Sequence, residues 1–104
     1  MQPAESNSRR VVVTGLGLIS PLGNSLTELW GALIDRRSGV KPLAALPRAP
    51  LPCSFAAEAR DFTGAIGDFG PLDKAKKKAI RKSSKLMCRE ILLGVAAAER
   101  AVQD

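Results

Sequence analysis

The chain has 104 residues and a formal net charge of +6, with two cysteines and no histidine. This length suits one domain or part of one, two cysteines exclude a disulfide framework, and no apolar run reaches the roughly 18 residues of a membrane span. The charge favours an acidic partner, such as nucleic acid, an anionic membrane surface or an acidic protein. We expect a cytoplasmic protein, because residues 1–8 are polar and lack the apolar core of a secretory signal.

The first predicted elements are a strand over residues 10–14 and a glycine-rich turn. Three consecutive valines at positions 11–13 are typical of a strand that is covered on both faces. Gly15 and Gly17 follow, and glycines there allow a tight turn or a close approach between two backbones. Residues 1–8 are expected to be a disordered lead-in to this folded part.

An amphipathic helix is predicted over residues 25–37. Ser25 and Glu28 have the spacing of a capping box, so the helix is expected to start at the serine. Cations near its end suit the helix dipole, and Gly39 is expected to close it. The apolar residues recur with helical periodicity; they are Leu26, Leu29, Trp30, Leu33 and Ile34.

The middle of the chain is predicted to contain one strand between two irregular stretches. Prolines exclude a complete hydrogen-bond ladder over residues 41–52. A second strand is predicted over residues 53–59, with Phe55 as its one large side chain. Residues 61–71 form a glycine-rich connection, after which Asp73 is expected to cap a helix.

Residues 74–103 are predicted to be helical, with a break near Arg81. Two stripes follow this region at helical spacing, about 120° apart. The apolar stripe consists of Ile80, Ser84, Met87, Ile91, Val95, Ala98 and Val102. The basic stripe consists of Lys74, Lys78, Arg81, Lys85 and Arg89.

Three motifs that suggest catalysis or nucleotide binding are better explained structurally. Residues 15–20 nearly match the dinucleotide fingerprint, but Ser20 replaces its third glycine and loop residues follow where a helix N-terminus is needed. Ser38 and Lys41 match S-x-x-K, yet the segment follows a helix and lacks the companion motifs. A cysteine nucleophile would need a base, and histidine is absent. We therefore expect no catalytic residue, metal ligand or cofactor in this chain.

The block RRVVVTGLGLISPLGNSLTELWGAL, residues 9–33, resembles the N-terminus of the β-ketoacyl-[acyl-carrier-protein] synthases, the type II condensing enzymes. The block GVAAAERAVQD, residues 94–104, resembles the helix that follows a basic segment in these enzymes. The resemblance implies an α/β, partial thiolase-like fold with a first strand, a capped helix, a second strand and a long C-terminal helical region. Residues 9–104 would form an incomplete half-domain, the N-terminal portion of the synthase domain, with the catalytic cysteine and histidines beyond Asp104.

The resemblance also implies a partner for the basic helix, which in this family receives the acidic acyl carrier protein. It places Lys82 and Lys85 on two docking positions and puts Leu86 where the family has a third cation. Arg81 or Arg89 is expected to compensate.

The implied reaction is decarboxylative Claisen condensation of an acyl thioester with malonyl carrier protein, in fatty-acid or polyketide biosynthesis. The resemblance implies a homodimeric parent enzyme without a membrane partner, in which this chain packs against the remainder of the synthase. The 104 residues alone are expected to be inactive.

Two alternatives stay open from charge alone: a stand-alone carrier-protein-binding module and a small basic nucleic-acid-binding protein. Residues 74–89 hold eight of the sixteen basic residues, but no aromatic residue is interleaved and no recognition motif is present. A solvated helix face is the usual state of such a run. A reading frame that continues past Asp104 would favour the synthase over both alternatives.

Overall fold

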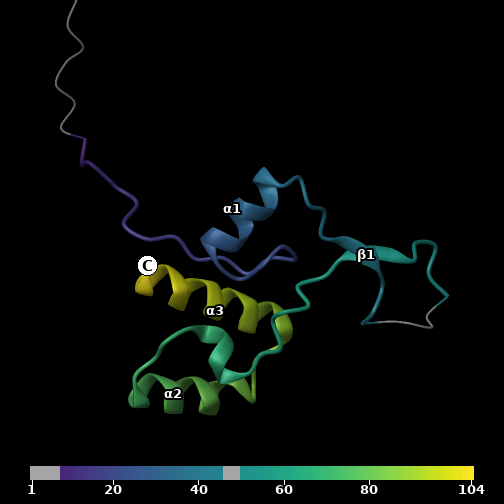
Figure 1. The fold of residues 1–104 in the computed structure, drawn as a ribbon. Helices are drawn as coiled ribbons and strands as arrows, with labels where there is room; N and C mark the ends of the chain where they lie inside the picture. The colour runs from purple at the N-terminus through teal and green to yellow at the C-terminus, as the bar shows by residue number, and fades with distance from the viewer. Residues whose placement is uncertain (1–7, 46–49) are drawn as a thin grey trace, which may run out of the picture.

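The computed structural model describes residues 8–45 and 50–104, so the expected lead-in at residues 1–8 lies outside the described residues apart from Ser8. Figure 1 shows α3 between α1 on one side and η1 with α2 on the other, while a small hairpin projects sideways. None of the helices in the described part is long and apolar enough to cross a membrane. The elements in chain order are α1 Leu26–Ile34, β1 Val40–Pro42, β2 Phe55–Ala57, the 3-10 turn η1 Ile66–Phe69, α2 Lys74–Ser84 and α3 Arg89–Gln103.

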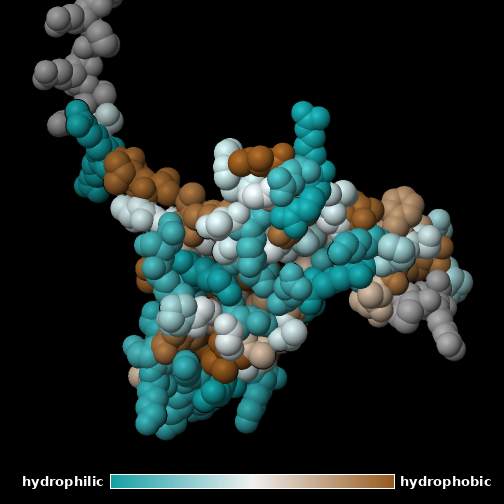
Figure 2. All heavy atoms as spheres, viewed as in Figure 1, coloured by the Kyte–Doolittle hydropathy of each residue, from teal (hydrophilic) through white to brown (hydrophobic). Residues whose placement is uncertain are grey.

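The predicted strand at residues 10–14 is wrong. These residues run as irregular chain, and Val11 is 90% exposed. In Figure 2 the segment is a hydrophobic stretch that stands away from the rest of the molecule. A β-branched run adopts a strand only where a neighbouring strand accepts and donates its backbone hydrogen bonds, and none of the described residues pairs with this segment.

The two glycines after this segment allow a close backbone approach, as predicted. A Cβ atom on Gly15 would overlap the carbonyl oxygen of Ala101, and one on Gly17 would overlap that of Ala97. The backbone N–H of Leu16 also donates to the Asp104 carboxylate at 3.0 Å. The glycines therefore serve to pack the N-terminal segment on the backbone of α3.

Helix α1 starts as predicted, because the Ser25 hydroxyl accepts a hydrogen bond from the Glu28 N–H at 3.1 Å. The Glu28 carboxylate reaches back to the N–H of Asn24, at 2.8 Å. These bonds satisfy the Glu28 N–H, which has no partner within the helix, and the N–H of Asn24, the residue before the cap.

The predicted end of α1 is wrong, since the helix stops at Ile34 and not near Arg37. Arg36 adopts the left-handed conformation with φ 54°, and the Arg37 N–H donates to the Ala32 carbonyl at 2.9 Å. This is a Schellman ending, for which glycine is the usual residue. Gly39 has another role, because a Cβ there would come within 2.9 Å of the Pro21 side chain.

Strands β1 and β2 form an antiparallel hairpin in which Val40 pairs with Ala57 and Pro42 with Phe55. The second predicted strand is confirmed in its central residues. The expectation of irregular chain over residues 41–52 is wrong at its start, where β1 includes Pro42. A two-stranded sheet consists of edge strands alone, and an edge tolerates the missing N–H of a proline.

The prediction of a helical region with a break near Arg81 is wrong in the position of the break, which lies at residues 85–88. Helix α2 starts as expected, with the Asp73 carboxylate accepting from the Lys76 N–H at 2.8 Å. At its other end the Ser84 hydroxyl donates to the Arg81 carbonyl at 3.0 Å. Such a side-chain bond competes with the helical hydrogen bonds and favours an ending there.

The core consists of Phe62, Phe69, Ile80 and Ala96, so η1 is held between α2 and α3. The two phenylalanine rings meet edge to face, with 6.2 Å between their centroids. The break before α3 resets the helical phase, and the predicted apolar stripe is therefore not continuous. Ile80 is buried, but Val102 is 75% exposed.

Candidate functional site

The outer side of α2 carries a dense group of cations, since residues 74–89 hold eight of the sixteen basic residues, and Figure 2 shows hydrophilic side chains gathered over this helix. We call it the basic surface. Its members are exposed and positively charged; they are Lys74, Lys78, Arg81, Lys82 and Lys85.

The predicted docking residues Arg81, Lys82 and Lys85 stand together at the C-terminal end of α2, where Lys85 is the C-cap. Among the described residues, none of these three cations has a carboxylate within ion-pair distance. Cations suit the negative end of the helix dipole. This end of the helix thus presents charge that nothing in the described chain neutralises.

Several of the cations on α2 repel one another along the helix. Lys74 and Lys78 are four residues apart, as are Lys78 and Lys82, and a like-charge pair at this spacing costs about 0.2–0.5 kcal/mol. Among the described residues, Lys76 is the one cation of α2 in an ion pair, with Glu99 of α3 at 3.2 Å. The Asp73 cap and the buried Ile80 hold α2 in place despite the repulsion between its lysines.

Arg89 differs from the other predicted docking residues, because its guanidinium faces the protein. It donates to the Phe62 carbonyl at 3.1 Å and to the Ala59 carbonyl at 3.0 Å. Its Cζ atom lies 5.5 Å from the centre of the Phe62 ring, a cation–π distance. Arg89 therefore ties the start of α3 to the chain before η1, a role that helical spacing alone could not reveal.

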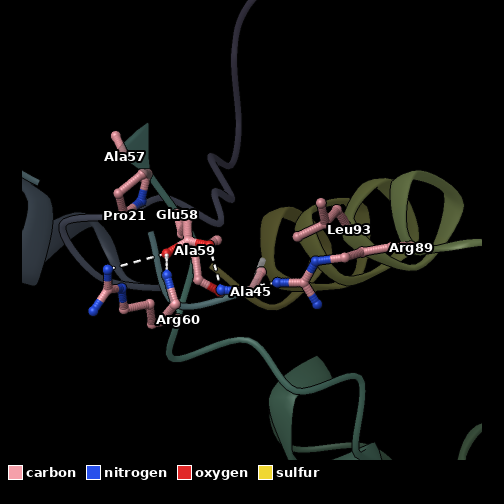
Figure 3. Close-up of a pocket in the computed structure, with 9 residues that line it drawn as sticks. Pro21, Ala45, Ala57, Glu58, Ala59, Arg60, Arg89 and Leu93 are labelled. Carbon is pink, nitrogen blue, oxygen red and sulfur yellow. Dashed lines mark hydrogen bonds and ion pairs between the residues drawn. The ribbon is translucent and has the colours of Figure 1, made fainter. Parts of the chain in front are cut away.

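A hollow of about 710 Å³ lies beside the hairpin, lined largely by alanines together with Glu58, Arg60 and Arg89. Figure 3 shows Glu58 and Arg60 turned toward each other, with Arg89 approaching from α3. The Glu58 carboxylate accepts from the N–H groups of Ala44 and Ala45 at 3.1 and 3.0 Å, and it pairs with Arg60 at 3.0 Å.

These contacts lower the pKa of Glu58, chiefly through the backbone hydrogen bonds from Ala45 and Ala44. The carboxylate is therefore ionised and fully engaged in holding the chain after β1. Sequence reasoning missed Glu58, because its partners lie 13 and 14 residues earlier in the sequence and no local spacing pattern connects them.

The two cysteines and the acidic residues of the described chain do not form a site for nucleophilic catalysis or for a metal ion. Cys53 and Cys88 are both exposed thiols, and no histidine is available to activate them. The described residues contain no cluster of three or more His, Cys, Asp or Glu side chains that could hold a metal ion. The arrangement is suited to binding through charge.

Comparison with known proteins shows that residues 8–104 match the family described as the beta-ketoacyl synthase, N-terminal domain. The chain belongs to this family. The resemblance inferred from residues 9–33 and 94–104 is therefore confirmed, and the family implies a thiolase-like fold, of which the three helices and the hairpin are a part.

Several relatives share the name 3-oxoacyl-[acyl-carrier-protein] synthase 2. The chain is 34% identical to that of Synechocystis sp. over 101 residues, which cover 97% of this chain and 22% of the relative. It is 34% identical to that of Vibrio harveyi over 98 residues, covering 94% of this chain and 21% of the relative. A segment of 58 residues is 50% identical to that of Coxiella burnetii and covers 56% of this chain and 14% of the relative. The chain thus spans about a fifth of the length of the Synechocystis and Vibrio harveyi relatives, which it matches over nearly all of its own residues.

Proposed function

We propose that this chain is the N-terminal part of a 3-oxoacyl-[acyl-carrier-protein] synthase of fatty-acid biosynthesis. The observation that carries the proposal is the family match over residues 8–104, together with relatives of that name over 97% of the chain. In the reaction that the family resemblance implies, a cysteine thiol takes the acyl group from its carrier thioester and the carrier thiol is released. Malonyl carrier protein then loses CO₂, and the resulting enolate attacks the carbonyl of the acyl-cysteine thioester and expels the cysteine thiolate. The family resemblance also supports a cytoplasmic homodimer as the form of the whole enzyme.

The part that these residues play is recognition. We assign docking of an acidic acyl carrier protein to the end of α2, through Lys82 and Lys85 with Arg81 beside them. Their exposure and the lack of ion-pair partners among the described residues support this role. Arg89 acts indirectly, because its guanidinium donates to the carbonyls of Ala59 and Phe62 and so fixes the start of α3 next to the basic surface.

The proposal is tested by sequencing the native transcript across codon 104 and assaying the protein that it encodes. We expect an open reading frame past Asp104 and a full-length product that condenses acyl and malonyl carrier proteins. The purified 104-residue chain should show no turnover above a blank, because it contains no histidine. A stop codon directly after Asp104, with carrier-protein binding retained, would favour a stand-alone binding module.

A further inference from the structure

Leu86 stands out at the edge of the basic surface. It is 92% exposed, more than any other large apolar residue among those described. It lies in the short connection between α2 and α3, directly after Lys85. Single exposed leucines are common on soluble proteins, so its exposure needs further support before it indicates a site.

The first support is that the connection is ordered by hydrogen bonds. The Leu86 N–H donates to the Ser83 carbonyl at 3.0 Å, and the Met87 N–H donates to that of Ser84 at 3.2 Å. Met87 is half-buried, and Arg89 is anchored to Ala59 and Phe62. A leucine on such a fixed backbone loses little conformational entropy when a partner covers it.

The second support is the charge around it. Lys82 precedes Leu86 by one helical turn and Lys85 is its neighbour, and the described residues place no carboxylate in an ion pair with either lysine. Protein interfaces commonly combine an apolar contact at the centre with a charged or polar rim. The other strongly exposed apolar residues, such as Val11 and Val102, lie outside the basic run.

We propose that Leu86 is the apolar anchor of the docking surface. It packs against an apolar side chain on an acidic helix of the carrier protein, while Lys82 and Lys85 pair with the carboxylates around that side chain. This inference rests on the proposed function. It makes Leu86 a residue that determines which carrier proteins bind well, because a partner without the matching apolar group gains only the charge pairs.

The test is a titration of fluorescently labelled acyl carrier protein with the full-length protein, at about 50 and about 300 mM salt, since exposed charge pairs are screened over this range. Leu86→Ser should raise Kd about tenfold at both salt concentrations, because an apolar contact is not screened. Leu86→Lys should bind better than Leu86→Ser at low salt and lose that advantage at high salt. Ile34→Ser is the matched control: Ile34 is also exposed but belongs to α1, and its Kd should not change.

The outcomes separate the inference from the proposed function. If wild-type protein does not bind carrier protein at all, the docking proposal fails. If wild-type protein binds and reversal of Lys82 and Lys85 weakens binding while Leu86→Ser does not, only the anchor is refuted. If Leu86→Ser leaves the affinity unchanged but lowers the melting temperature by several degrees, Leu86 is covered by the protein itself. If Leu86→Ser leaves the affinity unchanged but abolishes self-association, a second copy of the protein covers Leu86. Both results contradict the anchor.

Discussion

The segment from η1 to α3 buries Phe69, Ile80 and Ala96 with Phe62 in one cluster, whereas the valines at positions 11–13 are 74–90% exposed. The first region finds its packing partners within the described chain, although Phe62 and Ala96 lie far apart in the sequence, and α2 starts at the Asp73 cap. The second needs a neighbouring strand, which the described chain does not offer. The radius of gyration, 18.5 Å, compares with about 13 Å for a compact domain of this length. The described chain thus packs its helical cluster by itself and leaves the valine segment without a strand to pair with.

The largest expected effect is a loss of folding stability when the buried cluster between η1, α2 and α3 is disrupted. Phe69 is fully buried, and Phe69→Ala should lower the free energy of unfolding by about 3–5 kcal/mol through lost burial and a cavity. The experiment uses the 104-residue chain, in which Val13→Ala is the control, because that side chain is 77% exposed and the substitution should change the free energy of unfolding by less than about 0.5 kcal/mol. Urea titrations followed by far-ultraviolet circular dichroism measure both. Equal losses for the two variants would contradict the contrast between the regions.

The next effect concerns recognition. Each exposed ion pair contributes roughly 0.2–1 kcal/mol, and reversing two charges adds repulsion. Lys82→Glu combined with Lys85→Glu should therefore weaken carrier-protein binding about tenfold or more, and less at high salt. Arg9→Glu with Arg10→Glu makes the same change of charge outside the basic surface and should have a much smaller effect. Calorimetric titration at two salt concentrations is the measurement, and tighter salt-sensitive binding to DNA than to carrier protein would instead support a nucleic-acid-binding protein.

A smaller effect is expected at the helix cap that starts α2. Asp73→Ala removes the acceptor of the Lys76 N–H and should cost about 1 kcal/mol. Asp73→Asn keeps an acceptor oxygen and should retain most of the stability. Equal thermal destabilisation of the two variants would show that the hydrogen bond is not what matters at this position.

The smallest expected effect is the change with pH in the hydrogen bonds that hold Ala44 and Ala45, after β1, to the Glu58 carboxylate. The pKa of Glu58 is lowered from 4.5 in the folded protein. The ionised carboxylate therefore contributes fully to folding stability above pH 4.5, and this contribution is lost as the pH falls through the lowered pKa of the folded state. The amide resonances of Ala44 and Ala45 should shift in that acidic range, as their acceptor is protonated. Glu58→Gln should remove the shift, and an unchanged acidic transition in that variant would contradict the assignment.

The sequence predicted best what depends on residues a few positions apart. The Ser25 and Asp73 caps involve partners three residues away. Ser25 was identified from its capping-box spacing to Glu28, and Asp73 from its residue type after a glycine-rich connection. Gly15 and Gly17 indicated a close approach, although the spacing could not name α3 as the neighbour. The family was recognisable because these local signals occur in its characteristic order.

What the sequence did not predict depends on contacts between distant residues. Helical spacing predicted Arg89 on one stripe with Lys85, yet the helix breaks at residues 85–88 and the Arg89 guanidinium donates to carbonyls 27 and 30 residues away. Helix α2 ends where the Ser84 side chain bonds to the backbone and where α2 and α3 pack as separate helices. The periodicity of apolar and basic residues in the sequence indicates neither feature. The valines at 11–13 have strand propensity, but pairing and not propensity decides whether a strand forms.

Residue-resolved hydrogen exchange tests the central claim most directly, by comparing the 104-residue chain with the full-length protein. If the chain is the N-terminal part of a synthase, the amides of residues 11–13 should exchange freely in the chain alone, where no strand pairs with them. In the full-length protein they should be slowed by roughly a hundredfold or more, as expected for a hydrogen-bonded central strand. Fast exchange of these amides in both proteins, or protection already present in the isolated chain, would contradict the account.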